Sequence, residues 1–111
     1  MVRIDYRANQ RIERPVFGTA IHRSDGIHLN GPNTRLDDCV LEVAEGQGTV
    51  VHRMEHVPLL PGTYYFSAVA YDWSCRHPYD HHDQLYTFTI LEGGTKELHG
   101  CISLPHSWSY E

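Results

Sequence analysis

The fold is decided by the stretch PLLPGTYYFSAVAYDWSCRHPYDHHDQLYTFTIL, which runs from Pro58 to Leu91. It opens with Pro61-Gly62, a turn signal, because Pro presets φ and Gly accepts the positive φ of a type II turn. Aromatic and β-branched residues then dominate residues 63–72, and apolar and polar side chains alternate again over residues 84–91. We therefore predict two long strands that are joined by a loop over residues 73–83.

The first of these strands has two faces of different chemistry. Its even-numbered residues over 64–70 are smaller and more uniformly apolar, so we predict that they face the core. The opposite face carries the hydroxyl groups of Tyr65, Ser67 and Tyr71, as expected of a face that meets water or a polar ligand. Tyr64 follows a turn and enters a core strand, which predicts a hydroxyl bonded to the backbone, as in a tyrosine corner.

The rest of the chain also consists of short alternating segments that are bounded by turn residues. Gly18 lies inside one of them and predicts a bulge or a close approach of two backbones. Residues 35–48 are the least determined, because their apolar positions fit either a short strand or one helical turn. No segment has the 3.6-residue period of an amphipathic helix, so the sequence predicts an all-β, antiparallel β-sandwich. Further strands are predicted over residues 2–8, 15–23, 27–30, 49–57 and 98–104, with a polar connection over 9–14 and turns at 24–26 and 92–94.

Composition limits the classes of protein to consider. The chain has 111 residues, enough for one domain with one core, so we treat residues 1–111 as a single domain. A net charge of −5 with scattered Lys and Arg excludes a nucleic-acid surface. No apolar run reaches the roughly 20 residues of a membrane span, and the charged start of the chain is unlike a signal peptide. Cys39, Cys75 and Cys101 lack paired spacing, which predicts reduced thiols in a cytoplasmic protein.

The loop between the two long strands, together with the polar strand face, is the candidate binding site. Rigid strands commonly hold binding loops, and this loop is rich in aromatic rings, imidazoles and carboxylates. Rings can stack on the apolar faces of sugars, and carboxylates accept hydrogen bonds from sugar hydroxyls. The predicted carbohydrate-binding residues are Tyr65, Ser67, Tyr71, Trp73, His77, Tyr79, Asp80, His81 and His82.

Other roles for the same residues are less favoured by their spacing. Imidazoles and carboxylates are metal ligands, but the paired spacing of a structural zinc site and the HExxH element are both missing from the sequence. Asp72, Asp80 and Asp83 could pair for glycoside hydrolysis, but acidic residues beside aromatic rings also suit sugar binding alone, which we favour. The sequence also has no Gly-rich phosphate loop and no nucleophile elbow. We therefore predict no metal, no cofactor and no enzymatic activity. For Trp73 and Trp108, packing at a core or an edge is as good an interpretation as a ligand role.

An ordered set of short elements gives the chain a family resemblance. The elements are Arg14-Pro15-Val16-Phe17-Gly18, Arg23-Ser24-Asp25-Gly26, Gly31-Pro32-Asn33-Thr34, the run LLPGTYYFS at residues 59–67, Tyr79-Asp80, Phe88, Gly100 and Leu104-Pro105-His106-Ser107-Trp108. In this order they resemble the C-terminal carbohydrate-binding domain of Wzt, the ATPase subunit of O-antigen polysaccharide ABC exporters. The resemblance covers about nine-tenths of the chain, and it rests on the ordered set rather than on any single motif.

The resemblance implies an immunoglobulin-like β-sandwich on the cytoplasmic side of the bacterial inner membrane. It implies non-catalytic recognition of a finished O-polysaccharide, contact with the exporter's ATPase and permease subunits, and a homodimer. The sequence departs from the family pattern in having no Walker A motif or ATPase domain and no strand before Val2. We therefore interpret the chain as a domain excised from, or related to, a longer exporter subunit. The alternative is a structural or dimerisation sandwich without a sugar site.

Overall fold

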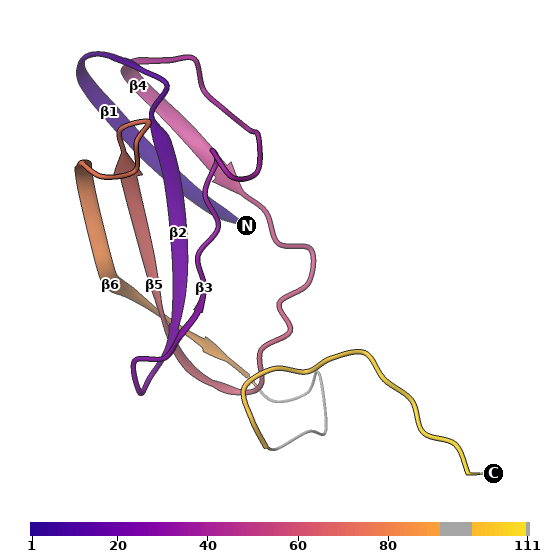
Figure 1. Cartoon of the computed structure of the whole chain (residues 1–111). Helices are drawn as coiled ribbons and strands as arrows, with labels where there is room; N and C mark the ends of the chain where they lie inside the picture. Colours follow the sequence, from indigo (N-terminus) through magenta and orange to yellow (C-terminus); the bar gives the residue numbers. More distant parts are fainter. Residues whose placement is uncertain (92–98, 111) are drawn as a thin grey trace.

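The computed structural model describes residues 1–91 and 99–110, and its regular elements are strands. Figure 1 shows the path of the chain through them. In the described part there is no helix, and hence none that is long and apolar enough to cross a bilayer. The predicted all-β class is confirmed. The strands are β1 (Val2–Glu13), β2 (Val16–Arg23), β3 (His28–Asn30), β4 (Val43–His52), β5 (Gly62–Tyr71) and β6 (Pro78–Ile90).

The strands form two antiparallel sheets that lie face to face (Figure 1). The smaller sheet holds β1 and β4, and the larger one has the order β3-β2-β5-β6. β5 lies in the middle of the larger sheet, where Phe66 is opposite Ile21 of β2 on one side and Tyr86 of β6 on the other. This arrangement confirms the predicted antiparallel β-sandwich, organised around the stretch from Pro58 to Leu91.

The core lies between the sheets and is built from alternate positions along the strands. Ile21, Tyr64 and Phe66 form a buried cluster. From the smaller sheet, the ring of Tyr6 contacts the ring of Phe17, with centroids 5.2 Å apart. Period-two alternation places one set of side chains on each face of a strand. The predicted core face of β5 is therefore confirmed by Tyr64 and Phe66.

Tyr64 makes the backbone contact that its position predicts. Its hydroxyl donates a buried hydrogen bond of 2.6 Å to the carbonyl oxygen of Leu60. Burial is the main reason why the pKa of Tyr64 is raised above its ordinary value, because a phenolate would lose its hydration there. The hydroxyl thus stays protonated and ties the start of β5 to the turn before it.

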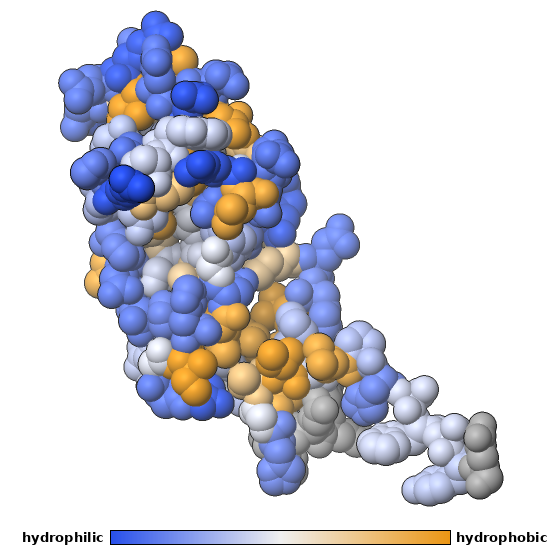
Figure 2. Space-filling view, in the orientation of Figure 1, coloured by the Kyte–Doolittle hydropathy of each residue, from blue (hydrophilic) through white to orange (hydrophobic). Residues whose placement is uncertain are grey.

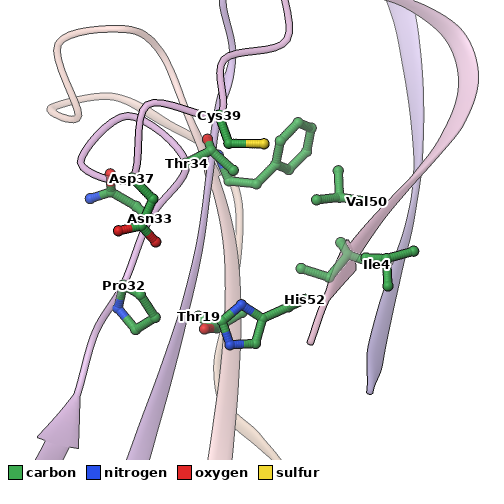
Figure 3. Close-up of a pocket in the computed structure, with 11 residues that line it drawn as sticks. Ile4, Thr19, Pro32, Asn33, Thr34, Asp37, Cys39, Val50 and His52 are labelled. Carbon is green, nitrogen blue, oxygen red and sulfur yellow. The ribbon is translucent and has the colours of Figure 1, made fainter. Parts of the chain in front are cut away.

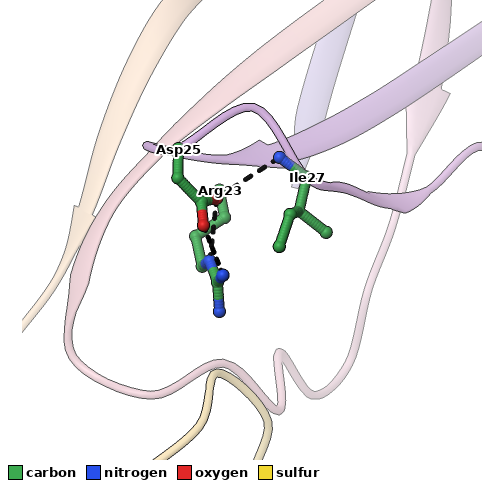
Figure 4. Close-up of polar contacts among 3 residues, drawn as sticks. All are labelled: Arg23, Asp25 and Ile27. Carbon is green, nitrogen blue, oxygen red and sulfur yellow. Dashed lines mark hydrogen bonds and ion pairs between the residues drawn. The ribbon is translucent and has the colours of Figure 1, made fainter.

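The turn between β2 and β3 is held by its own side chains (Figure 4). Arg23 donates from Nε to Asp25 Oδ1 at 2.9 Å and from Nη2 to the other carboxylate oxygen. The backbone N–H of Ile27 donates to the same carboxylate at 3.3 Å. The hydrogen bond from Arg23 is the largest of the effects that lower the pKa of Asp25 to about 2. The predicted hairpin turn at residues 24–26 is confirmed as a charge-paired turn.

The C-terminal segment begins against the sandwich and then leaves it. The N–H of Leu60 donates to the carbonyl of Cys101 at 2.9 Å, and the N–H of Ser103 donates to the carbonyl of Pro58 at 2.7 Å. Farther on, the chain runs outward (Figure 1, yellow), and Trp108 is 87% exposed. The radius of gyration is 16.9 Å, above the roughly 13 Å expected of a compact domain of this length. The outward segment explains the difference.

Two strand boundaries in the smaller sheet differ from the predicted ones. β1 continues to Glu13 across an irregularity between Ala8 and Ile12, so the expected polar connection over residues 9–14 is largely strand. The predicted strand over 49–57 is instead β4, which ends at His52 opposite Val2. A ladder needs a partner for each backbone group, and the partner strand begins at Val2.

The predicted last strand over residues 98–104 is also shorter than expected. In the described residues it is reduced to a single bridge between Ile102 and Leu59. Residue 98 and the predicted turn at 92–94 lie outside the described residues. The undetermined segment over 35–48 contains turns at its start and the first part of β4 at its end.

Candidate functional site

A groove of about 280 Å³ lies on the face of the larger sheet that is turned away from the core. Its floor consists of residues of β2 and β5 that alternate with the core residues, and its walls come from β3, the segment after it, and β6. We call this the outer groove. Its polar and aromatic side chains come from Thr19, His22, His28, Asn33, Ser67, Tyr71, His81 and Asp83.

One wall is the segment after β3, which lies directly against β2 at Gly18. Gly18 forms an antiparallel bridge with Asn33, and the N–H of Thr19 donates to the carbonyl of Pro32 at 3.1 Å. A Cβ atom at position 18 would lie only 3.1 Å from Cγ1 of Val69. The close backbone approach that Gly18 predicted is therefore confirmed, and it shapes the groove.

The outer groove offers hydrogen-bond donors from two side chains whose oxygen atoms are already engaged. Ser67 Oγ accepts the backbone N–H of Gln84 at 2.8 Å, which leaves its hydroxyl proton available to a ligand. Asn33 Oδ1 accepts the backbone N–H of Leu36 at 2.8 Å, which leaves the amide NH2 as the donor end. Both side chains are positioned by the backbone and are thus oriented before any ligand arrives.

Two imidazoles lie side by side at one end of the groove. The rings of His22 and His28 are stacked, with centroids 4.6 Å apart and an interplanar angle of 11°. His28 Nε2 lies 2.7 Å from the carbonyl oxygen of Asn30. Because a carbonyl only accepts, Nε2 carries the hydrogen, and Nδ1 of the neutral ring is an acceptor. His22 Nδ1 is buried and has no hydrogen-bond partner in the described part of the chain.

Three of the predicted binding residues meet in the outer groove. Ser67 and Tyr71 come from β5 and His81 from β6, and the rings of Tyr71 and His81 tilt toward each other with centroids 6.5 Å apart. Tyr65 is opposite His22 in the ladder, and alternation places it on the same face of β5. The alternation in the sequence thus grouped Tyr65, Ser67 and Tyr71 on one face, whereas His81 was predicted to lie in the loop.

The predicted loop over residues 73–83 is wrong in its second half, because β6 begins at Pro78. Neighbouring residues of a strand point to opposite faces, so Asp80 and His82 face the smaller sheet while His81 faces the outer groove. Asp80 Oδ2 lies 3.3 Å from His82 Nε2. Asp80 and His82 line a separate cleft of about 430 Å³ that also includes residues of β1. Tyr79 lines the same cleft, because the ladder is irregular between Pro78 and Asp80 and the alternation does not hold there. The nine predicted residues therefore do not form one continuous surface.

Trp73 lies in the short connection between β5 and β6 and is held by two arginines. The guanidinium carbon of Arg14 is 4.6 Å from the centroid of the Trp73 ring, and that of Arg35 is 4.9 Å away. Arg35 Nη1 also donates to the Trp73 carbonyl at 3.0 Å. Cation–π contacts of this kind join three connections at one end of the sandwich. The ring is therefore engaged within the protein, which favours its interpretation as a packing residue.

The same connection places His77 at its exposed end. The N–H of Asp72 donates to the carbonyl of His77 at 3.1 Å, and the N–H of His77 donates to Asp72 Oδ1 at 3.3 Å. Burial acts to raise the pKa of Asp72, but hydrogen bonds from Ser74 and from the backbone outweigh it and lower the pKa. The carboxylate of Asp72 thus stays ionised and closes the connection on itself.

A further cavity of about 190 Å³ lies between the sheets on the side of β4 (Figure 3). Ile4 and Val50 of the smaller sheet face Thr34 and Cys39 across it. Its wall mixes apolar side chains of the two sheets with polar ones of the segment after β3, such as Asn33 and Asp37. Cys39, like Cys75 and Cys101, is a free thiol.

Four residues of the outer groove were missed by the sequence prediction. His22, His28 and Asn33 belong to the hairpin of β2 and β3 and to the segment after it, far from β5 along the chain. Asp83 was placed in a loop without a defined direction. Gly18 was the one available signal, since it indicated that another backbone lies close to β2.

Metal binding gains no support from the geometry. Within residues 1–91 and 99–110, no group of three or more His, Cys, Asp or Glu side chains could hold a metal ion. The neighbouring His81 and His82 face opposite sides of the sheet. We therefore do not interpret the histidine-rich stretch as a metal centre.

These features define a class: a small β-sandwich domain with an open, polar and aromatic groove on the outside of its larger sheet. The model of the Wzt C-terminal domain family matches residues 1–104, and the chain belongs to that family, which is associated with O-antigen ABC exporters. Among solved structures, the crystal structure of the C-terminal domain of wzt is similar, with a TM-score of 0.85 at 19% identity. That match covers 98% of this chain and 68% of the other. No curated protein matches the sequence.

Proposed function

We propose that the chain binds a bacterial surface polysaccharide, such as an O-antigen glycan, and presents it to an ABC exporter without changing it chemically. The observation that carries the proposal is the outer groove, where Ser67, Tyr71 and His81 meet on rigid strands beside donors and acceptors. An open groove suits a long polymer better than a closed cavity does. Membership of the Wzt C-terminal domain family supports the same proposal. The expected partners are the ATPase and permease subunits at the cytoplasmic face of the inner membrane.

The proposed contact residues follow from where the side chains lie. Tyr71 and His81 offer rings for stacking, Ser67 offers a hydroxyl, and Tyr65 continues the same face. Neither Trp73 nor His77 is among the residues that line the groove, and the Trp73 ring is engaged by two arginines. Tyr79, Asp80 and His82 face the cleft beside β1, so we leave them out of the proposed contact set.

Alanine replacement of Tyr71 or His81 is expected to weaken binding of O-polysaccharide about fivefold in each case. A stacked ring contributes on the order of 1 kcal/mol, and 1.4 kcal/mol is a factor of ten in affinity. The measurement is calorimetric titration with O-polysaccharide purified from the organism that carries the gene. Thr89→Ala, an exposed change near the far end of β6, is the matched control and should bind as the parent does.

Trp73→Ala separates a ligand role from a packing role in the same titration. We expect a lower free energy of unfolding with little change in affinity, because the ring holds Arg14 and Arg35. If the parent chain fails to bind the polysaccharide at all, a structural sandwich without a sugar site is the better interpretation. If binding survives both groove variants unchanged, the contact surface lies elsewhere.

We also propose that the domain forms a two-fold homodimer. In the described residues β1 pairs with β4 alone, so its other edge is open to a further strand. Figure 2 shows apolar side chains gathered at the end of the sandwich from which the C-terminal segment leaves. Leu91, Leu104 and Trp108 are between 66% and 87% exposed. Exposed apolar groups of this kind mark association surfaces.

Sedimentation of the chain is expected to give the mass of a dimer. The variant that carries both Trp108→Ser and Tyr110→Ser should shift toward monomer, because the aromatic side chains of the outward segment would no longer bury apolar area in a partner. Leu36→Ser, an exposed change in the connection between β3 and β4, is the control and should remain dimeric. A monomer at the highest attainable concentration would refute the proposal.

A further inference from the structure

We propose that the outer groove selects uncharged sugars over acidic ones, and that Asp83 and His28 make the selection. The inference rests on the proposed function, since it concerns what the same groove accepts. It names a chemical class: neutral hydroxyl-rich sugar residues rather than uronic acids or phosphorylated sugars.

The first argument is the charge of the groove. Among the described residues that line it, Asp83 is the only one with a formal charge at neutral pH when imidazoles are counted as neutral. The ladder between β5 and β6 is irregular there, because Phe66 is opposite Tyr86 and Ala68 is opposite His82. Irregular ladders re-aim side chains beside binding sites, and Asp83 lines the groove from this irregular part. A carboxylate or phosphate on a ligand would meet a like charge.

The second argument is the balance of donors and acceptors. Asp83 only accepts, and His28 offers Nδ1 as an acceptor because its Nε2 is committed to the carbonyl of Asn30. Ser67 and Asn33 supply donors. A sugar hydroxyl both donates and accepts, so it can satisfy either kind of group. An acidic group accepts only, and it would leave the acceptors of Asp83 and His28 unpaired.

The stacked imidazoles add a flat surface to the groove. The rings of His22 and His28 lie nearly parallel, with centroids 4.6 Å apart and an interplanar angle of 11°. A flat ring face can stack on the apolar face of a sugar, and its edge can bond the sugar hydroxyls.

The test compares two sugars of the same shape that differ in charge. Methyl glucoside and glucuronic acid, the latter as its methyl glycoside, are titrated into the full chain at neutral pH, and the amide and side-chain signals of the outer groove are followed by NMR. We expect glucuronic acid to bind at least about threefold more weakly, as a unit like charge a few ångströms away requires even in water. Asp83→Asn should bring the two affinities close together.

Asp80→Asn is the matched control, because it removes the same charge from the same strand on the opposite face. It should leave the preference unchanged. His28→Phe keeps a ring against His22 but removes Nδ1, together with the contact between Nε2 and the carbonyl oxygen of Asn30, and it should weaken the binding of methyl glucoside severalfold. Glucuronic acid binding as tightly as methyl glucoside would overturn the inference and leave the proposed function standing. If neither sugar shifts the signals of the groove, both the inference and the proposed sugar site fail.

Discussion

Replacing Phe66 by Ala is expected to lower the free energy of unfolding by about 3–5 kcal/mol, the range for truncating a buried aromatic ring. Phe66 is 8% exposed and packs in one cluster with Ile21 and Tyr64. It also lies at the centre of the larger sheet, with strands on both sides. Neighbouring strands hold their spacing through backbone hydrogen bonds, so the cavity left by the ring can collapse only in part.

The measurement is urea unfolding of the parent and the variant, followed by tryptophan fluorescence. Domains of this size are stable by only about 5–15 kcal/mol, so the variant should be close to unfolding at room temperature. Leu85→Ala is the control: the side chain is also apolar, but it is 64% exposed on β6. This control should lower the free energy of unfolding by less than about 0.5 kcal/mol. An equal loss in the free energy of unfolding for the two variants would show that the core does not lie on the predicted face of the strands.

β5 was predicted well because its two faces differ strongly in polarity. Phe66 lies on one face and Ser67 on the other. Apolar and polar side chains that alternate in this way can be separated into a buried and an outer face only by a strand. The same alternation identified Tyr65, Ser67 and Tyr71 as one surface. Sequence reasoning is sufficient where a single strand decides both the fold and the direction of its side chains.

The first half of β6 was mistaken for a loop because residues 78–83 are polar on both faces. A period-two pattern of polarity cannot appear where both faces are polar. The strand forms for another reason: β5 has a free backbone edge there, and Ala68 and Ala70 find partners in His82 and Asp80. This tertiary requirement has no local signal, and it divides the histidine-rich stretch between two faces.

The outer groove could be predicted only in part for a related reason. Its β5 residues share one face by local periodicity, whereas His22 and His28 arrive through the pairing of β2 with β5 and β3. Which distant strand lies beside another is not encoded in local periodicity. Gly18 indicated either a bulge or a close approach of another backbone to β2, and it did not show which backbone that would be. The identity of that neighbour, the segment around Asn33, required the structure.

Replacing Gly48 by Val is expected to lower the free energy of unfolding by about 3 kcal/mol, at the upper end of the usual cost of overpacking. Strand propensity alone predicts that this change raises the free energy of unfolding, because Val favours strands and Gly weakens them. Gly48 is opposite Tyr6 in the ladder between β1 and β4. A Cβ atom at position 48 would lie 2.3 Å from Cζ and Oη of Tyr6. The ring must move, and it would then lose its contact with Phe17.

A double-mutant cycle in urea unfolding isolates this cause. If the ring of Tyr6 is the obstacle, Gly48→Val should cost much less in a Tyr6→Ala background, and the two changes should be non-additive by more than about 1 kcal/mol. Gln47→Val, at the exposed neighbouring position of β4, is the control and should stay within about 0.5 kcal/mol of the parent. Additive costs would contradict the packing of Tyr6 over Gly48. β1 pairs with β4 alone in the described residues, so displacing Tyr6 would destabilise the whole smaller sheet. This sheet covers the core on the side opposite the outer groove.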